Sequence, residues 1–278
     1  DLLTTLRNII LVPFYLYSAI KTAAIIIKEK PDIIINDFEP FTAYIGKIFF
    51  IPLIEVNNNQ VISKGKIAVP KESFFDYIKS RIILKIVVPI ANKYIISSFF
   101  EVPLKSKKAV LVAPILRKEV KKLKPQKKDY VLVYQTSKSN SKLLHELKKI
   151  DQEFIIYGFN IDKKEANLNF RAFDNKQFYK DLANCKAIIT NGGFTLITEA
   201  IYLKKPILSI PIKKQFEQMT NALYVEKLGF GKKIKEANKK DIENFIRNIK
   251  KYQNKTKKCK DIKRNAVAEI ENAIKQLL

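Results

Sequence analysis

The sequence predicts an α/β protein of two domains, each with a parallel β-sheet flanked by helices. Short unbroken apolar runs, such as Ile33–Ile35 and Ala187–Ile189, are typical of strands buried on both faces of a parallel sheet. Helical patterns lie between these runs, and 278 residues are enough for two hydrophobic cores. Residues 117–128 are dense in lysine and contain a proline, so we expect them to form the linker between the domains.

The first domain is expected over residues 1–116 and begins with one or two amphipathic helices interrupted at Pro13. Two further helical patterns follow, at Phe41–Phe49 and Phe74–Ala91. The strands are expected at the apolar runs Ile33–Ile35, Ile51–Val56, Tyr94–Ser97 and Ala109–Val112. The chain starts at Asp1 without a methionine, inside a helical pattern, so we expect either a fragment or a trimmed form of a longer sequence.

The second domain is expected over residues 129–260. Helices are predicted at Ser141–Ile150 and Phe194–Leu203, and the lysine-rich stretch Asp241–Leu278 is also helical in pattern. The strands are expected at Tyr130–Tyr134, Phe154–Tyr157, Asn169–Phe173, Ala187–Ile189 and Pro206–Ile210. This alternation predicts βαβ units, which bind their ligands beyond the carboxyl ends of the strands.

The turn after Ala187–Ile189 has the residues of an anion site. Gly192 and Gly193 let the backbone turn sharply and let a ligand approach the amide groups. The unpaired N–H groups and the positive dipole end of the following helix suit a phosphate. Thr195 adds a hydroxyl, and Glu199, one turn further on the same face, is well placed to accept hydrogen bonds from ribose hydroxyls. The alternative is a plain tight turn followed by an exposed helical glutamate.

A polar loop after the next strand favours the nucleotide interpretation, because its Gln and Glu side chains offer donors and acceptors for hydroxyls. Together with the glycines, this loop resembles the donor-binding half of GT-B glycosyltransferases. The resemblance is closest to the group of the lipid II N-acetylglucosamine transferase and the UDP-glucuronosyltransferases. It covers Leu182 to Gly231, with one departure at Asn191, where many members carry His. The matching residues are Gly192–Gly193, Thr195, Glu199–Ala200, Lys205–Pro206, Pro211, Gln215–Gln218, Asn221–Ala222 and Gly229.

The resemblance implies two Rossmann-like domains and a nucleotide-sugar donor, UDP-linked, bound by the second domain. The pyrophosphate would rest on the two glycines and Thr195, the ribose on Glu199, and the sugar on Glu217 and Gln218. The loop Asp174–Gln177 would hold the uracil base through backbone groups. The donor site would comprise Thr136, Ser137, Asn191, Gly192, Gly193, Phe194, Thr195, Glu199, Gln215, Glu217, Gln218 and Asn221.

The resemblance also bears on the two ends of the chain. A complete GT-B acceptor domain opens with a strand and a glycine-rich loop, and neither lies before Leu2, so the first domain is expected to lack both. The terminal helix of the GT-B fold returns to the first domain, and residues 261–278 are the segment expected to do so here.

Two carboxylates follow the first strand of the first domain, Asp37 and Glu39. A carboxylate there is a candidate general base, since glycosyl transfer requires that a sugar hydroxyl lose its proton. Capping of the next helix by Asp37 is the equally weighted alternative. No metal is expected, because the chain has no Asp-x-Asp run, and no cofactor is expected beyond the donor itself.

The formal net charge of +25 indicates an anionic partner, although codon bias in an AT-rich genome would also produce it. We expect an anionic membrane surface and a lipid-linked acceptor, contacted through the basic amphipathic stretches Leu2–Lys28 and Phe74–Ala91. A nucleic-acid partner is not expected, because no aromatic-basic motif for base stacking is present. Cys185 and Cys259, far apart in the chain, suit a reducing cytosol, at the inner face of the membrane.

The leading interpretation is therefore a glycosyltransferase that uses a UDP-sugar. One alternative is a nucleotide-sugar epimerase of the same architecture, which would act on UDP-N-acetylglucosamine without an acceptor. The other is a non-catalytic subunit that binds the donor for a separate chain. The sequence does not identify the sugar, the acceptor or the oligomeric state.

Overall fold

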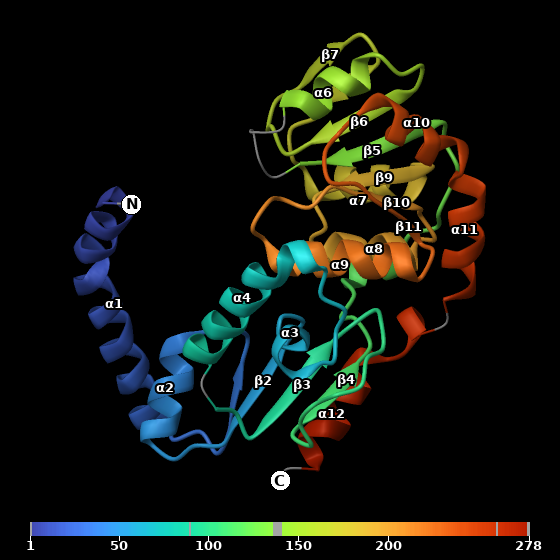
Figure 1. Ribbon diagram of the computed structural model, residues 1–278. Coiled ribbons are helices and arrows are strands. Elements are labelled where there is room, and N and C mark those ends of the chain that lie inside the picture. Colours follow the sequence, from blue (N-terminus) through green and yellow to red (C-terminus); the bar gives the residue numbers. More distant parts are fainter. Residues whose placement is uncertain (1, 89, 136–140, 260, 277–278) are drawn as a thin grey trace. The chain divides into compact units, whose positions relative to one another are not determined.

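The computed structural model describes residues 2–88, 90–135, 141–259 and 261–276. The chain forms two compact units. Unit 1 comprises Asp1–Ile67, Tyr77–Val112 and Val267–Leu278, and unit 2 comprises Ala68–Asp76 and Ala113–Ala266. Each unit holds its own mainly parallel sheet, which confirms the predicted α/β class (Figure 1).

Unit 1 is built on a four-stranded sheet in the order β1-β2-β3-β4, with every pair parallel. The strands are β1 (Ile34–Asn36), β2 (Leu53–Asn57), β3 (Lys93–Ser97) and β4 (Ala109–Val112). The helices around them are α1 (Leu2–Glu29), α2 (Pro40–Ile48), α3 (Gln60–Lys64), α4 (Phe74–Val87) and α12 (Ala266–Lys275). The short 3-10 helix Lys71–Ser73 precedes α4.

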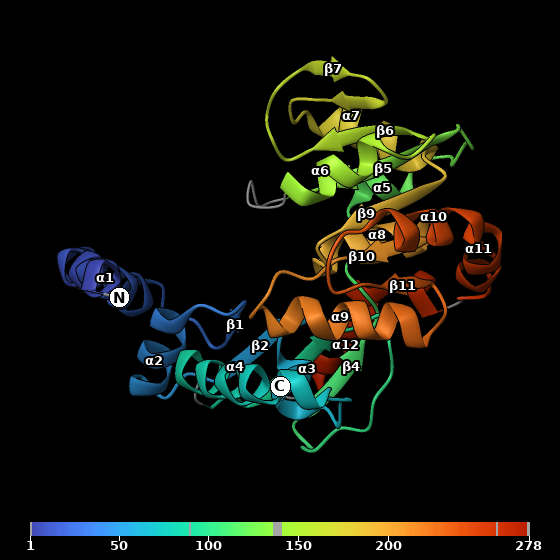
Figure 2. The ribbon, with the colours of Figure 1, turned by 45° about the horizontal axis from the view of Figure 1, so that its top comes forward.

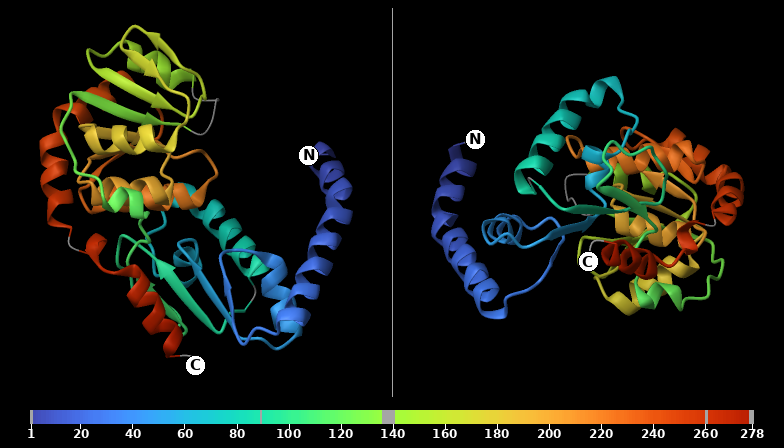
Figure 3. Two further views of the ribbon diagram at one scale, coloured as in Figure 1. Left: turned by 180° about the vertical axis from the view of Figure 1, so that it is seen from behind. Right: turned by 90° about the horizontal axis from the view of Figure 1, so that it is seen from below.

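The two ends of the sequence both contribute helices to unit 1. The predicted interruption at Pro13 is wrong, because α1 runs through it, and a helix can lose one N–H donor while its other turns stay bonded. The Tyr15 ring of α1 lies 6.4 Å from the Phe41 ring of α2, and the two helices are neighbours in Figure 3. At the other end, Ala273 of α12 packs into the core of the sheet with Ile54 and Ile95.

Unit 2 is built on a seven-stranded sheet in the order β11-β10-β9-β5-β6-β8-β7, in which only β7 is antiparallel. The strands are β5 (Tyr130–Tyr134), β6 (Glu153–Tyr157), β7 (Lys163–Glu165), β8 (Leu168–Phe170), β9 (Ala187–Thr190), β10 (Ile207–Ser209) and β11 (Gly231–Lys233). The helices are α5 (Lys118–Lys121), α6 (Ser141–Lys148), α7 (Asn175–Asn184), α8 (Phe194–Tyr202), α9 (Phe216–Lys227), α10 (Lys239–Arg247) and α11 (Ile249–Lys258), followed by the 3-10 helix Asp261–Lys263.

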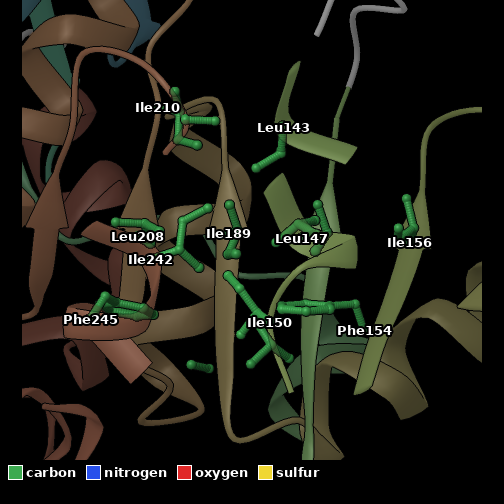
Figure 4. Close-up of a cluster of buried hydrophobic side chains, with 14 of the residues drawn as sticks. Leu143, Leu147, Ile150, Phe154, Ile156, Ile189, Leu208, Ile210, Ile242 and Phe245 are labelled. Atoms are coloured by element: carbon green, nitrogen blue, oxygen red, sulfur yellow. The ribbon is translucent and has the colours of Figure 1, made fainter. Parts of the chain in front are cut away.

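One face of this sheet packs against α6 and α10, which lie in front of the strands in Figure 2. Leu147 of α6 and Phe245 of α10 are almost fully buried, together with Phe154 and Ile189 of the sheet, as Figure 4 shows. Burying a side chain of this kind contributes roughly 1.5–3 kcal/mol, so this cluster holds β5, β6, β9 and β10 in register. The carboxyl ends of these strands thereby become a fixed platform.

The structure differs from the sequence expectations at several places in unit 2. Residues 117–128, expected as a linker, belong to unit 2, because α5 inserts the fully buried Val120. Strand β11 was not predicted, since it begins at Gly231. A Cβ at Gly231 would lie 1.7 Å from the Ile207 carbonyl oxygen, so the close pairing requires glycine. The expected helix Asp241–Leu278 is divided into α10, α11 and α12.

Candidate functional site

A pocket of about 210 Å³ lies in unit 2 where β9 ends and α8 begins. Its walls come from the β9–α8 turn, from the first turns of α8, from α7 and α9, and from two segments far away in sequence. The lining residues are Arg117, Tyr134, Phe173, Phe178, Thr190, Asn191, Gly193, Phe194, Thr195, Leu196, Glu199 and Gln218. This is the carboxyl end of a parallel strand, where ligands of such sheets bind.

The two glycines of the turn have different roles. Gly192 has φ +102°, and a Cβ there would lie 2.8 Å from the Gln218 carbonyl oxygen, so this position requires glycine. Gly193 has φ −63°, and a Cβ there would meet no atom of the described residues within 4 Å. The space in front of Gly193 is therefore open.

This open space lies at the N-terminus of α8. Gly193 is the N-cap residue, and having no side chain it does not itself cap the helix. The first N–H groups of a helix have no partner within it and carry its positive dipole end. Thr195, exposed in the first turn, adds a hydroxyl beside them. The arrangement can bind a phosphate or diphosphate.

Glu199 lines the same pocket one turn further along α8, with only 1% of its surface exposed. Its Oε1 atom lies 3.5 Å from Nη1 of Arg117 and accepts no hydrogen bond from any described residue. Burial raises the pKa of Glu199 to about 7, and the charge of Arg117 opposes that rise. Arg117 is itself held by a 2.9 Å hydrogen bond to the Tyr179 hydroxyl. A ligand hydroxyl that donates to Glu199 would stabilise its ionised form.

An aromatic wall faces this end of the sheet. Tyr134 at the end of β5, Phe173 before α7 and Phe178 within α7 lie with ring centroids 5.3–6.4 Å apart. Phe173 is 45% exposed and lines the pocket, so it presents a flat apolar surface to a ligand. The adjacent Asp174, in the loop expected to hold a base, accepts a 2.7 Å hydrogen bond from the Gln177 amide and caps α7.

Asn191 is buried and anchors the β9–α8 turn to the neighbouring strands. Its Nδ2 atom donates to Oε1 of Gln135 at 3.1 Å and to the Ile210 carbonyl oxygen at 3.3 Å. Gln135, at the end of β5, is 1% exposed, and its Nε2 atom has no described partner. Thr136 and Ser137, which were expected in the donor site, lie outside the described residues.

The polar residues 215–221, expected as a loop, form the start of α9, and the structure separates them. Gln218 lines the pocket, and its Oε1 atom accepts a 3.0 Å hydrogen bond from the Ile212 amide. Asn221 is buried, and its Nδ2 atom donates to the Gly192 carbonyl oxygen at 3.1 Å, so it supports the turn instead of lining the pocket. Exposed Gln215 lines another pocket of unit 2, and Glu217 lines neither.

The two candidate bases lie in unit 1 after β1, and their environments differ. Glu39 caps α2: its carboxylate accepts hydrogen bonds from the Phe41 and Thr42 amides at 3.0 and 2.7 Å. The capping role that was considered for Asp37 thus belongs to Glu39, whose oxygens are occupied. Asp37 is exposed.

Sequence reasoning missed a third carboxylate beside this loop, the fully buried Glu55 of β2. It accepts hydrogen bonds from the Phe38 amide at 3.0 Å and from Nδ2 of Asn36 at 2.9 Å, so it fixes the loop that carries Asp37. Burial raises the pKa of Glu55 to about 7. Sequence reasoning also missed Arg117, Tyr134, Phe173 and Phe178, because side chains far apart in sequence converge only in the folded sheet.

Comparison with known proteins assigns this chain to a family. The sequence model described as glycosyl transferase family 1 matches residues 2–250. A search of curated protein sequences gives no match.

Solved structures share the fold at low sequence identity. The structure of Os79 from O. sativa in complex with UDP and deoxynivalenol-3-glucoside has a TM-score of 0.68 at 12% identity, over 93% of this chain and 82% of that chain. The spinosyn forosaminyltransferase SpnP has a TM-score of 0.63 at 11% identity, over 92% and 78%. LpCGTa in complex with UDP has a TM-score of 0.60 at 14% identity, over 89% and 75%.

The family model spans most of the chain, and the similar structures confirm the GT-B fold predicted from the sequence. The narrower resemblance to the lipid II N-acetylglucosamine transferase group stays a prediction. The chain is a glycosyltransferase with the GT-B fold and belongs to glycosyl transferase family 1.

Proposed function

We propose that this glycosyltransferase takes its sugar from a UDP-linked donor and that the pocket at the β9–α8 turn binds the UDP. One observation carries the proposal: three features suited to the three parts of a nucleotide line a single pocket. They are the N-terminus of α8 at Gly193, the buried carboxylate of Glu199, and the aromatic surface of Phe173. The printed descriptions of Os79 and LpCGTa, which name UDP in those complexes, support the choice of nucleotide.

In this proposal each feature binds one part of the donor. The diphosphate accepts hydrogen bonds from the first N–H groups of α8 and from the Thr195 hydroxyl. The ribose hydroxyls donate to Glu199, and the base lies against Phe173. The positive end of α8 then offsets the charge that develops on the leaving diphosphate during transfer. Gln218, at the edge of the pocket, is the side chain that we assign to the sugar.

The acceptor hydroxyl loses its proton to Asp37 in this proposal. Asp37 is exposed, whereas the oxygens of neighbouring Glu39 are already bonded to the amides of α2. The hydrogen bonds of Glu55 hold the backbone on one side of Asp37. We do not retain the epimerase or the non-catalytic subunit, since membership of a glycosyltransferase family favours transfer.

We further propose that unit 1 contacts an anionic membrane that carries a lipid-linked acceptor, on the cytoplasmic face. No described helix is both long enough and apolar enough to span a bilayer. Unit 1 nevertheless exposes many large apolar side chains on α1 and next to α2, including Phe14, Leu16, Ile20 and Phe50. Lysines of the same helices accompany them, which suits the surface of an anionic bilayer.

Vesicle co-sedimentation tests the membrane proposal. Anionic vesicles should sediment the protein at low salt, whereas neutral vesicles should not, since each Lys or Arg near an anionic surface contributes about 1 kcal/mol. Replacing Lys79, Arg81 and Lys85 of α4 with glutamate should release the protein. If the triple variant sediments like the wild type, α4 is not part of the membrane surface.

Calorimetric titration with nucleotides tests the donor proposal. UDP should bind, and CDP, GDP and ADP should bind more weakly if the pocket discriminates between bases. Phe173→Ala should weaken UDP binding by roughly 1–3 kcal/mol, the contribution of one base–aromatic contact. Ile161→Ala, which alters another exposed apolar side chain of unit 2, is the matched control. Equal affinity for all four nucleotides, unchanged in Phe173→Ala, would contradict the assignment of the base.

A further inference from the structure

A pocket of about 370 Å³ lies in unit 1 between α3 and α4, and the donor chemistry does not use it. This volume is within the range of small-molecule sites. Gln60, Ser63 and Lys64 line it from α3, and the rest of the lining comes from α4 and the residue after it. None of the described residues that line it carries a carboxylate.

Three cations converge on this pocket: Lys64 from α3, and Arg81 and Lys85 from α4. Arg81 and Lys85 are four residues apart and therefore share one face of the helix. In the described part of the chain, none of the three pairs with a carboxylate. Instead, the ammonium nitrogen of Lys64 lies 4.0 Å from the centroid of the Tyr94 ring, and the guanidinium of Arg81 lies 5.5 Å from that of Tyr77. Like charges gathered without a counter-charge favour an anionic ligand.

A buried amide points to the same kind of ligand. Gln60 is 2% exposed, and its Oε1 atom accepts a hydrogen bond from the Ser63 hydroxyl. Its Nε2 atom is buried and has no hydrogen-bond partner among the described residues. Leaving such a donor unpaired is costly, and an acceptor oxygen in the pocket would satisfy it.

The remaining lining is apolar, and it leads out of the pocket. Ile78 and Ile82, one turn apart on α4, line one side, and Leu84 and Val88 are buried beneath. Ile82 is 53% exposed, so the apolar lining continues onto the open surface of α4. A ligand that fits both parts has an anionic head and an apolar chain. Phosphate suits the head, because it offers several acceptor oxygens to an arginine and to neighbouring donors.

We infer that this pocket binds the phosphate group of an amphiphile, whose apolar chain leaves along Ile78 and Ile82. Lys64, Arg81 and Lys85 supply the counter-charge, and Gln60 donates a hydrogen bond to a phosphate oxygen. The identification of this amphiphile with the acceptor rests on the proposed function, in which the acceptor is linked to a lipid. The binding of the phosphate amphiphile stands on the pocket alone.

Titration of the full chain with dodecyl phosphate, below its micelle concentration, tests the inference. Inorganic phosphate and dodecyl maltoside serve as the other two probes. Dodecyl phosphate should bind at least about tenfold more tightly than either, because the pocket recognises both the charge and the chain. Equal binding of inorganic phosphate would refute the role of the chain, and equal binding of the maltoside would refute recognition of the anion.

Two double variants of equal charge locate the site. Arg81→Gln with Lys85→Gln removes two pocket cations, and Lys107→Gln with Lys108→Gln removes two exposed cations of unit 1 outside the pocket. The first pair should weaken dodecyl phosphate binding by at least about tenfold, since it removes charge-assisted hydrogen bonds, and the second should leave it within about twofold. Equal effects of the two pairs would overturn the inference.

UDP titration of the same variants separates this inference from the proposed donor site. UDP should bind equally to the wild type and both variants, because the pocket cations lie in unit 1. If UDP binding is normal and both double variants bind the amphiphile equally well, the phosphate pocket is refuted and the donor site is not. If the wild type does not bind UDP, the donor site is refuted, and the amphiphile titrations still test the phosphate pocket.

Discussion

Glu199→Gln is the substitution that examines the donor site most closely, because the carboxylate is buried and one of its oxygens has no hydrogen-bond donor among the described residues. Its Oε1 atom accepts no described hydrogen bond, and the nearest charge is Arg117 at 3.5 Å. If ribose hydroxyls donate to it, the ionised form gains hydrogen bonds that are each worth roughly 1.5–3 kcal/mol. Glutamine keeps the shape but loses the charge, so the affinity for the donor should fall by about 10- to 150-fold above pH 8.

The pH dependence gives this prediction a second readout. Burial raises the pKa of Glu199 to about 7 in the free protein, and donated hydroxyls should lower it in the complex. About a tenth of the Glu199 carboxylates are then ionised at pH 6 and about nine tenths at pH 8. The affinity for the donor should therefore rise about tenfold from pH 6 to pH 8. Glu199→Gln should remove the slope.

Calorimetry with UDP-glucose at pH 6, 7 and 8 measures both effects. UDP-glucose is preferable to UDP, whose terminal phosphate titrates near pH 6 and adds its own slope. Titrations in buffers of different ionisation enthalpy should also detect proton release at pH 6.5. A wild-type affinity that does not change with pH, or a slope that persists in Glu199→Gln, would refute the ribose assignment.

Three further predictions concern other residues. Gly193→Val should keep the fold, since φ −63° and the open space accept a side chain, yet it should block the helix end and lower UDP affinity by more than about 100-fold. Exposed Lys164→Val is the calorimetric control, and equal losses of UDP affinity in the two variants would indicate misfolding. Asp37→Asn should lower kcat by about 10²- to 10⁴-fold in a product assay without changing UDP affinity. Glu39→Gln should mainly lower the free energy of unfolding, by about 0.5–2 kcal/mol, because it removes the cap of α2. The reverse pattern would make Glu39 the base. Burial raises the pKa of Glu55 from 4.5 to about 7, so the folded state binds this proton more tightly than the unfolded state does. The free energy of unfolding should therefore fall by at most about 3 kcal/mol as pH rises from 4.5 through 7. Urea denaturation should show a smaller fall in Glu55→Gln, and a fall equal to that of the wild type would contradict the assignment.

Local signals in the sequence were enough to place most strands and the helix that follows the glycines. Ala187–Ile189 is an apolar run that ends at a glycine pair, and both the strand and the helix start are fixed by neighbours in the chain. Thr195 and Glu199 both line the pocket, as the pattern predicts, because one turn of the helix after the glycine pair separates them. The strands that were missed are short, and β11 begins at a glycine that long-range pairing requires.

The other half of the pocket depends on contacts that no local pattern contains. Phe173 was expected as the end of a strand, and only the packing of α7 beside β5 brings it to Glu199. Arg117 lies in a lysine-rich stretch that resembles a linker, and its role comes from the burial of Val120 next to it. Asn221 was expected to touch the ligand, but the position of Gly192 in the fold makes it a support for the turn.

A crystal structure of the chain with UDP is the most direct test of the donor site. The account predicts the diphosphate within hydrogen-bond distance of the Thr195 amide and hydroxyl, both ribose hydroxyls on the Glu199 carboxylate, and the base against Phe173. UDP bound elsewhere in the chain, with no ligand hydroxyl on Glu199 and no phosphate at the N-terminus of α8, would contradict it.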